Sequence, residues 1–283
     1  MSEIRVEALT HVYSAGTPFE KTAIENISLS IPSGQFVGLL GHTGSGKSTF
    51  IQHLNALLKP SSGTVYVDGE DINKDKKSRR AVKNKVGLVF QYPEYQLFEE
   101  TVFADIAFGP KNMGLSKEEI EQRVHEACGF VGVEEELLQR SPLELSGGQK
   151  RRIAIAGVIA MRPGVLILDE PTAGLDPAGC RQIMDNICRY RRESGATVLI
   201  VSHNMDDAAR LTERLIVFNR GTVAMDGTPE QIFAQPERLV EIGLNVPQST
   251  ALAMALREKG VQLAGSIYTH AQLMQALKGV GAC

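Results

Sequence analysis

The sequence has few cysteines and no long apolar run, and both deficits narrow the class of protein. Its four cysteines, among 283 residues, show neither Cys-x-x-Cys spacing nor the density of a disulfide scaffold, so we expect reduced thiols. The longest apolar run, IAIAGVIAM at 153–161, is half as long as the roughly eighteen residues of a membrane span and predicts a buried helix. The opening residues, MSEIRVEALT, lack the basic and apolar regions of a signal peptide. A cytosolic chain is therefore expected, although a membrane partner remains possible.

Basic residues are not in excess either. The 30 Lys and Arg residues against 33 Asp and Glu residues give a net charge of −3, which argues against nucleic acid as the main partner. The basic run KDKKSRRAVKNK at 74–85 is better explained as a solvated helix face, with attraction to anionic lipid headgroups as a secondary benefit. With 43% hydrophobic residues, the chain can build one large domain plus an appendage, or two domains.

Short apolar segments separated by helical ones predict an α/β fold. Runs of four to six residues rich in Val, Ile and Leu are typical of buried parallel strands. They are FVGLL (36–40), VGLVF (86–90), VLIL (165–168), TVLIV (197–201) and LIVF (215–218). Before and between them, the alternation of Ile27, Leu29 and Ile31 and the segment TVYVDG at 64–69 predict an N-terminal antiparallel β portion. The sheet core should therefore be parallel, with an antiparallel addition.

Two segments lack such strands and contain helix signals instead. Residues 94–144 read as a helical insertion, in which Ser116 and Glu119 form a capping box. Residues 228–283 read as a small helical extension, with Thr228 as a cap before Pro229 and a second box from Thr269 to Gln272. We therefore expect a nucleotide-binding unit at 1–227 and a C-terminal unit at 228–283 that supports dimerisation.

The segment GHTGSGKST, directly after an apolar strand, is typical of a phosphate-binding loop. It fits G-x-x-x-x-G-K-[ST] and precedes a helix, so a chance glycine-rich turn is a poor explanation. Lys47 would reach the β- and γ-phosphates, and the Ser48 hydroxyl would bind Mg²⁺. The predicted nucleotide-binding residues here are Gly41, His42, Thr43, Gly44, Ser45, Gly46, Lys47, Ser48 and Thr49.

Polar residues end three of the predicted strands beside this loop. Each could be an ordinary polar strand terminus, but the carboxyl ends of parallel strands meet at one edge of a sheet, where ligands bind. Asp169 would hold Mg²⁺, and Glu170 would act as the general base toward water. Gln91 would supply an oxygen to the metal or water, and His203 a hydrogen bond to the γ-phosphate.

A second anion site is indicated by LSGGQ at 145–149. Ser146, Gly147 and Gly148 precede an apolar helix, so their amides and the helix dipole face outward together, although an ordinary helix cap would look the same. Combined with the phosphate loop, Gln91, LDEPTAGLD and His203, this segment makes residues 1–227 resemble an ATP-binding cassette (ABC) ATPase of the P-loop NTPase fold.

That resemblance explains why one chain has two anion sites. In the family, the phosphate loop of one subunit and the LSGGQ of another enclose the same ATP, head to tail. The resemblance implies that Ser146 through Gln149 contact ATP in a partner, that Tyr13 stacks on adenine, and that Asp176 belongs to the inter-subunit loop. This loop reads AGLD where many members have SALD, a mild change at the interface.

Two further segments resemble a narrower group. YPEYQLFEETVFADIAFGPKN, after Gln91, and LNVPQSTALAMALREKG, in the tail, are similar to the energy-coupling factor importers of vitamins and metal ions, most of all to the second of their two paired ATPases. The resemblance implies a second ABC ATPase as partner, a transmembrane coupling protein docked near Gln91–Phe108, an indirect link to a substrate-binding membrane protein, and a place at the cytoplasmic face of the cell membrane. We expect the groove residues among Tyr92, Tyr95, Leu97, Phe98, Val102 and Phe108.

Three alternatives remain open. A cytosolic cassette that acts on DNA would have a long coiled coil between its two anion sites, and one that acts on ribosomes would have two cassettes in one chain. A regulator without turnover would not need Glu170 and His203. The chain could also be the ATPase of a conventional ABC importer. The transported substrate does not follow from this chain, which does not contact it.

Overall fold

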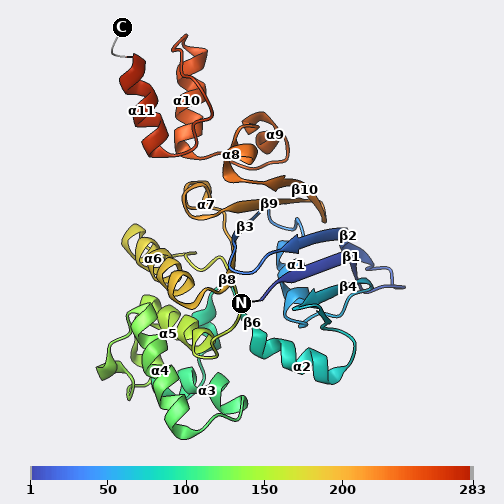
Figure 1. The fold of residues 1–283 in the computed structure, drawn as a ribbon, viewed down its shortest axis with the longest axis vertical. Helices are drawn as coiled ribbons and strands as arrows, with labels where there is room; N and C mark the ends of the chain where they lie inside the picture. Colours follow the sequence, from blue (N-terminus) through green and yellow to red (C-terminus); the bar gives the residue numbers. More distant parts are fainter. Residues whose placement is uncertain (1, 281–283) are drawn as a thin grey trace.

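A six-stranded sheet forms the centre of the structure, a computed structural model that describes residues 2–280 (Figure 1). Its strands are β3 (Phe36–Leu40), β6 (Val86–Val89), β7 (Val165–Asp169), β8 (Thr197–Val201), β9 (Arg214–Asn219) and β10 (Thr222–Gly227). They lie in the order β10-β9-β3-β8-β7-β6, and all neighbours are parallel except β10 and β9. All five predicted parallel strands are confirmed, and their carboxyl ends share one edge.

A four-stranded antiparallel sheet covers part of this core, as the alternating pattern near the N-terminus predicts. It contains β1 (Ile4–Tyr13), β2 (Lys21–Ile31), β4 (Ser62–Val67) and β5 (Glu70–Asp71), in the order β2-β1-β4-β5. Helix α1 (Lys47–Leu54) packs between the two sheets, where Phe50 contacts Phe218 with ring centroids 5.1 Å apart. The N-terminal end of α1 is thereby fixed beside the carboxyl ends of the central strands.

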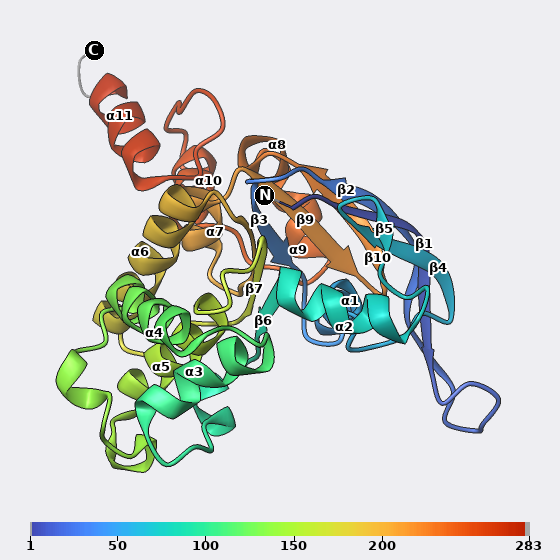
Figure 2. The same cartoon turned by 60° about the horizontal axis from the view of Figure 1, so that its bottom comes forward.

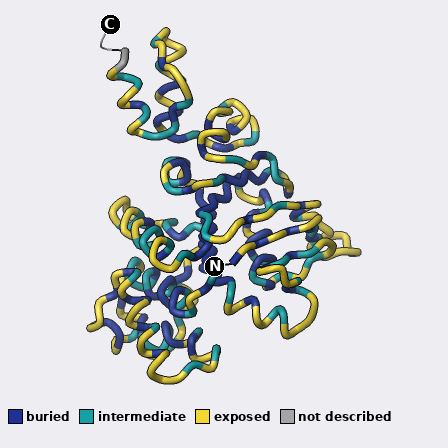
Figure 3. The backbone as a smooth tube through the Cα atoms, viewed as in Figure 1, coloured by how far each residue is buried: buried dark blue, intermediate teal, exposed yellow. Residues whose placement is uncertain are grey.

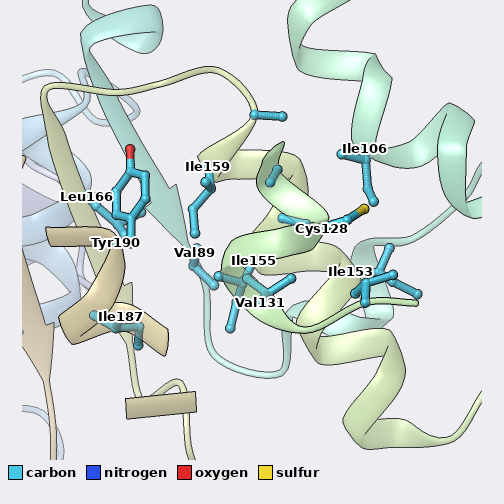
Figure 4. Packing of buried hydrophobic residues seen from close by; sticks show 14 of the residues in the cluster. Val89, Ile106, Cys128, Val131, Ile153, Ile155, Ile159, Leu166, Ile187 and Tyr190 are labelled. Atoms are coloured by element: carbon cyan, nitrogen blue, oxygen red, sulfur yellow. The ribbon is translucent and has the colours of Figure 1, made fainter. Parts of the chain in front are cut away.

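Helices cover the other face of the central sheet. They are α3 (Val102–Asn112), α4 (Lys117–Val131), α5 (Gly147–Ile159) and α6 (Pro177–Ser194), with short 3₁₀ turns at Pro93–Gln96, Glu135–Leu137 and Pro142–Glu144. Figure 4 shows part of their shared apolar core, including Ile106 of α3, Cys128 of α4 and Ile153 of α5. The capping box from Ser116 to Glu119 is present. Helix α5 is packed against α3 and α4, so the helical layer includes the apolar helix after LSGGQ.

The C-terminal residues form two groups of helices. Helices α8 (Pro229–Phe233) and α9 (Pro236–Glu241) share an apolar cluster with α7 (Met205–Leu211), β9 and β10. Helices α10 (Gln248–Glu258) and α11 (His270–Val280) have a small cluster of their own and project away from the sheets (Figures 1 and 3). The predicted cap at Thr228 and box at Thr269 are both present.

The remaining sequence predictions concern the surface and the thiols. The basic run forms α2 (Lys76–Lys85), a largely exposed helix that lies in front near the middle of Figure 2 and whose one buried side chain is Val82. Among residues 2–280, no helix is both long and apolar enough to cross a membrane. Cys128, Cys180 and Cys188 are free thiols, whereas Cys283 lies outside the described residues.

Candidate active site

The phosphate loop connects β3 to α1 in a conformation that only glycine adopts easily. Gly41 has φ +151°, and a Cβ there would lie 2.6 Å from the Phe218 carbonyl oxygen. Gly46 has φ +107°, and its Cβ would lie 2.8 Å from the carbonyl oxygen of Ala23 on β2. The loop is therefore held between β2 and β9, with its backbone amides at the start of a helix.

Lys47 is the positive charge of this loop. Its side chain is buried, and Nζ donates to the carbonyl oxygens of Gly41 at 2.6 Å and His42 at 3.0 Å. Burial lowers the pKa of Lys47, while the charges of Glu170 and Asp169 oppose that shift. The Lys47 ammonium therefore lies among carbonyl oxygens of its own loop and near two carboxylates.

Ser48 and Asp169 place oxygen atoms side by side at the end of β7. The Ser48 hydroxyl donates to Asp169 Oδ2 at 3.2 Å, and Asp169 is 7% exposed. Burial is the main cause of the raised pKa of Asp169, and Glu170 adds to it. A bound cation would stabilise this carboxylate. Among residues 2–280, no group of three or more His, Cys, Asp or Glu side chains is placed to hold a metal ion.

Glu170 joins the two other predicted catalytic residues. Gln91 Nε2 donates to Glu170 Oε2 at 2.9 Å, and His203 Nε2 lies 2.9 Å from Glu170 Oε1. The Glu170 backbone has φ +48°, an uncommon value for a residue other than glycine, which the surrounding structure must hold. The ends of β6, β7 and β8 thus bring these three residues together.

These residues line a cavity of about 450 Å³. Tyr13 forms part of its wall, and its hydroxyl contacts Thr49 Oγ1 at 3.2 Å. Predicted residues in the lining are Tyr13, Thr43, Gly44, Ser45, Gly46, Lys47, Ser48, Thr49, Gln91, Glu170 and His203. Lys21 and Ala23 of β2 also line it. Sequence reasoning missed both, because neither belongs to a motif.

The LSGGQ segment and Asp176 are not in this lining. Ser146 and Gln149 form a capping box at the start of α5, with the Ser146 amide 2.9 Å from Gln149 Oε1. A Cβ at Gly147 or Gly148 would meet no atom within 4 Å. Asp176 caps α6 by accepting from the Gly179 amide at 2.8 Å. Nothing in the packing of the described residues requires these two glycines.

A second hollow, of about 650 Å³, lies between α2, α3 and α5. Leu97, Phe98 and Phe108 line it, and the two phenylalanine rings meet edge to face at 5.0 Å. Phe98 is 65% exposed. The expectation that Val102 contributes to this surface is wrong, because Val102 begins α3 and is fully buried in the core beneath it.

The chain resembles transport proteins in sequence. The family model described as "ABC transporter" matches residues 24–173. The energy-coupling factor transporter ATP-binding protein EcfA2 of Caldanaerobacter subterraneus subsp. tengcongensis is 54% identical over 266 residues, which cover 94% of this chain and 93% of that protein. EcfA2 of Clostridium tetani is 52% identical over 275 residues, covering 97% and 96%.

Solved structures agree with the sequence comparison. CbiO1 of Clostridium perfringens, part of the ABC transporter complex CbiONQ, has a TM-score of 0.75 at 39% identity, covering 89% of this chain and 98% of its own. MJ0796, a bacterial ABC transporter cassette solved as a dimer, has a TM-score of 0.72 at 32% identity, covering 80% and 98%. The chain therefore belongs to the ABC transporter ATPases and, within them, to the energy-coupling factor transporter ATP-binding proteins.

Proposed function

We propose that this chain hydrolyses ATP as one of two cassette ATPases that power an energy-coupling factor importer at the cytoplasmic face of the cell membrane. The observation that carries the proposal is the separation of two features. The cavity contains the phosphate loop and Glu170, whereas the LSGGQ segment lies outside its lining and has two glycines that no packing among the described residues explains. A second cassette accounts for both features. The relatives named EcfA2 support a partner that is itself a different ATPase.

Within one cavity, each side chain has a separate task in hydrolysis. Glu170 accepts the proton of the attacking water, and its contacts with Gln91 and His203 fix the direction of its two oxygens. Lys47 pairs with β- and γ-phosphate oxygens, and the loop amides bind the rest of the triphosphate. Tyr13, in the wall, stacks on adenine. Phosphoryl transfer mainly requires positioning and charge neutralisation, which these groups supply.

The oxygen donors around β7 fit Mg²⁺. Ser48 Oγ and the Asp169 carboxylate would hold it, with Gln91 Oε1 as a third ligand, since the Gln91 amide nitrogen already donates to Glu170. When bound, Mg²⁺ would neutralise charge on the phosphate oxygens. Burial raises the pKa of Asp169, and a bound cation would stabilise the ionised form of this carboxylate.

The LSGGQ segment serves the cavity of the partner ATPase. Ser146, Gly147 and Gly148 start α5, so amide groups and the positive end of the helix dipole face a γ-phosphate without side chains in between. Gln149 holds this turn through its capping box, and Asp176 lies in the neighbouring inter-subunit loop. Residues 1–227 form the nucleotide-binding unit, and the tail at 228–283 strengthens the association.

Residues 91–108, the docking segment, receive a helix of the membrane-embedded coupling protein. This segment exposes aromatic side chains beside the hollow, and Gln91 at its start touches Glu170. An amphipathic helix placed in an apolar groove is a common mode of recognition. Contact with the substrate-binding membrane protein is indirect.

Purification from native membranes tests the proposal. A tagged chain should carry with it a second cassette ATPase and a multi-span membrane protein. Phe108→Asp should release the membrane protein, whereas Leu57→Asp should not, although both side chains are 43% exposed and only Phe108 lines the hollow. Recovery with ribosomes or DNA and without membrane proteins would contradict the proposal.

A further inference from the structure

Arg151 is a charged side chain with almost no access to water. It lies on α5, shortly after LSGGQ, and its side chain is 3% exposed. Its guanidinium forms a two-pronged pair with Glu94 of the docking segment: Nε lies 3.0 Å from Oε2, and Nη2 lies 2.7 Å from Oε1. Such paired hydrogen bonds fix both partners in position and orientation.

The same guanidinium also holds the loop that follows Glu170. Its Nη1 donates to the carbonyl oxygens of Pro171, at 3.4 Å, and Ala173. The Ala173 amide in turn donates to the Glu170 carbonyl oxygen at 3.1 Å. Because Glu170 has φ +48°, its backbone must be held by its surroundings. Arg151 thus contacts the docking segment and the loop next to the catalytic carboxylate at once.

Stability alone is a weak reason for this arrangement. A buried ion pair is often replaceable by apolar side chains of similar volume without loss of stability. Glu94 is nevertheless charged: burial opposes ionisation, but the hydrogen bonds from Arg151 and the Glu94 backbone outweigh it, and the pKa of Glu94 is lowered. The pair keeps two charges where three segments meet: the docking segment, the start of α5 after LSGGQ, and the loop after Glu170.

We propose that Arg151 is a positioning residue that couples the docking segment to the backbone of Glu170. The inference rests on the proposed function, because it assigns the docking segment to a membrane partner. Movement of that partner's helix shifts Glu94, and Arg151 carries the shift to residues 171–173. Neither Arg151 nor Glu94 lines the nucleotide cavity, so hydrolysis depends on the pair whereas ATP binding does not.

Steady-state ATP hydrolysis by the complete transporter in lipid vesicles tests this coupling. Arg151→Met should lower kcat about tenfold or more and change KM for ATP by less than about twofold, since misplacing a catalytic group affects the chemical step. Arg151→Lys keeps the positive charge but cannot form the two parallel hydrogen bonds to Glu94, so its kcat should lie between those of Arg151→Met and the wild type. Arg162→Met is the matched control. It breaks an exposed pair with Glu126, away from the cavity, and should leave both constants unchanged.

A double-variant cycle separates coupling from two independent effects. Arg151→Met and Glu94→Leu remove the same link, so the double variant should be no slower than Arg151→Met alone. It also leaves no unpaired buried charge and therefore carries the test if a single variant fails to fold. A folded, assembled double variant with the wild-type kcat would overturn the proposal. So would a double variant whose fold reduction in kcat equals the product of the reductions in the two single variants. A wild-type complex that hydrolyses ATP without moving solute would contradict the proposed function while leaving the kcat comparison intact.

Discussion

Replacing Glu170 with glutamine should slow turnover by at least about a hundredfold and leave ATP bound. Glutamine has the same shape: its amide oxygen can accept from Gln91 Nε2, and its amide nitrogen can face His203 Nε2, so both neighbours at 2.9 Å keep a partner. Only the basic oxygen is lost. A general base contributes about 10²- to 10⁴-fold, so kcat should fall by that factor, or about 3 to 5 kcal/mol of transition-state stabilisation.

Two measurements on the same preparation test this expectation. Single-turnover hydrolysis reports the chemical step, and retention of labelled ATP on a sizing column reports binding. Lys47→Ala is the contrasting variant: it removes the charge on the phosphates, and loss of a charged hydrogen bond, about 1.5–3 kcal/mol, should weaken ATP binding roughly 10- to 150-fold. If Glu170→Gln turned over within tenfold of wild type, another residue would be the base.

Two other predictions concern stability and assembly. Burial, together with His11, lowers the pKa of His53 from 6.5 to about 4. As the pH falls, His53 therefore becomes protonated in the unfolded chain while it stays neutral in the folded chain, which favours unfolding. About 2 kcal/mol of the unfolding free energy should therefore be lost between about pH 7.5 and about pH 5. Urea titrations at several pH values should show that His53→Leu loses about 2 kcal/mol less over this range than the wild type. The same pH dependence in both proteins would contradict the prediction. A chain ending after Gly227 should still bind nucleotide but associate less stably with the partner ATPase. It should also unfold at a lower temperature than a chain ending at residue 246, because it loses the buried side chains of Phe233 and Leu239. Calorimetry measures the unfolding temperature of both truncated chains, and size-exclusion chromatography measures their association with the partner. Loss of nucleotide binding by a truncated chain that is still folded would place the tail in the active site.

Much of the fold could be predicted because local pattern and tertiary structure agree. The short apolar runs form the parallel strands, and the glycine-rich loop lies between the strand FVGLL and a helix, as its motif predicts. Motif order then placed Gln91, Glu170 and His203 at one sheet edge. Residues that follow adjacent parallel strands meet wherever the sheet forms, so their proximity needs no knowledge of side-chain packing.

Contacts between distant segments could not be predicted. Arg151 and Glu94 are 57 residues apart, and nothing in KRR distinguishes the buried arginine from its partly exposed neighbours Lys150 and Arg152. Val102 was expected at the surface because its segment is rich in aromatic residues, yet it faces inward at the start of α3. Periodicity indicates that a helix has an apolar face, but only packing decides which residues at its ends lie on that face.

The shared ATP site is the central claim, and the placement of two lesions tests it directly. Lys47→Ala disables a phosphate loop, and Ser146→Arg fills the space opposite a partner's γ-phosphate. All chains carry the glutamine replacement at the catalytic glutamate, so that ATP-locked pairs accumulate and can be counted on a sizing column. If the two cassettes are different proteins, the corresponding positions of the partner cassette are used.

With Lys47→Ala in one cassette and the Ser146→Arg lesion in the other, one site receives both defects and the other none. With both lesions in one cassette and an unaltered partner, each shared site receives one defect. We predict an ATP-dependent pair in the first arrangement and none in the second. A pair that forms only in the second arrangement would mean that each chain closes its own site, and the shared-site account would be wrong.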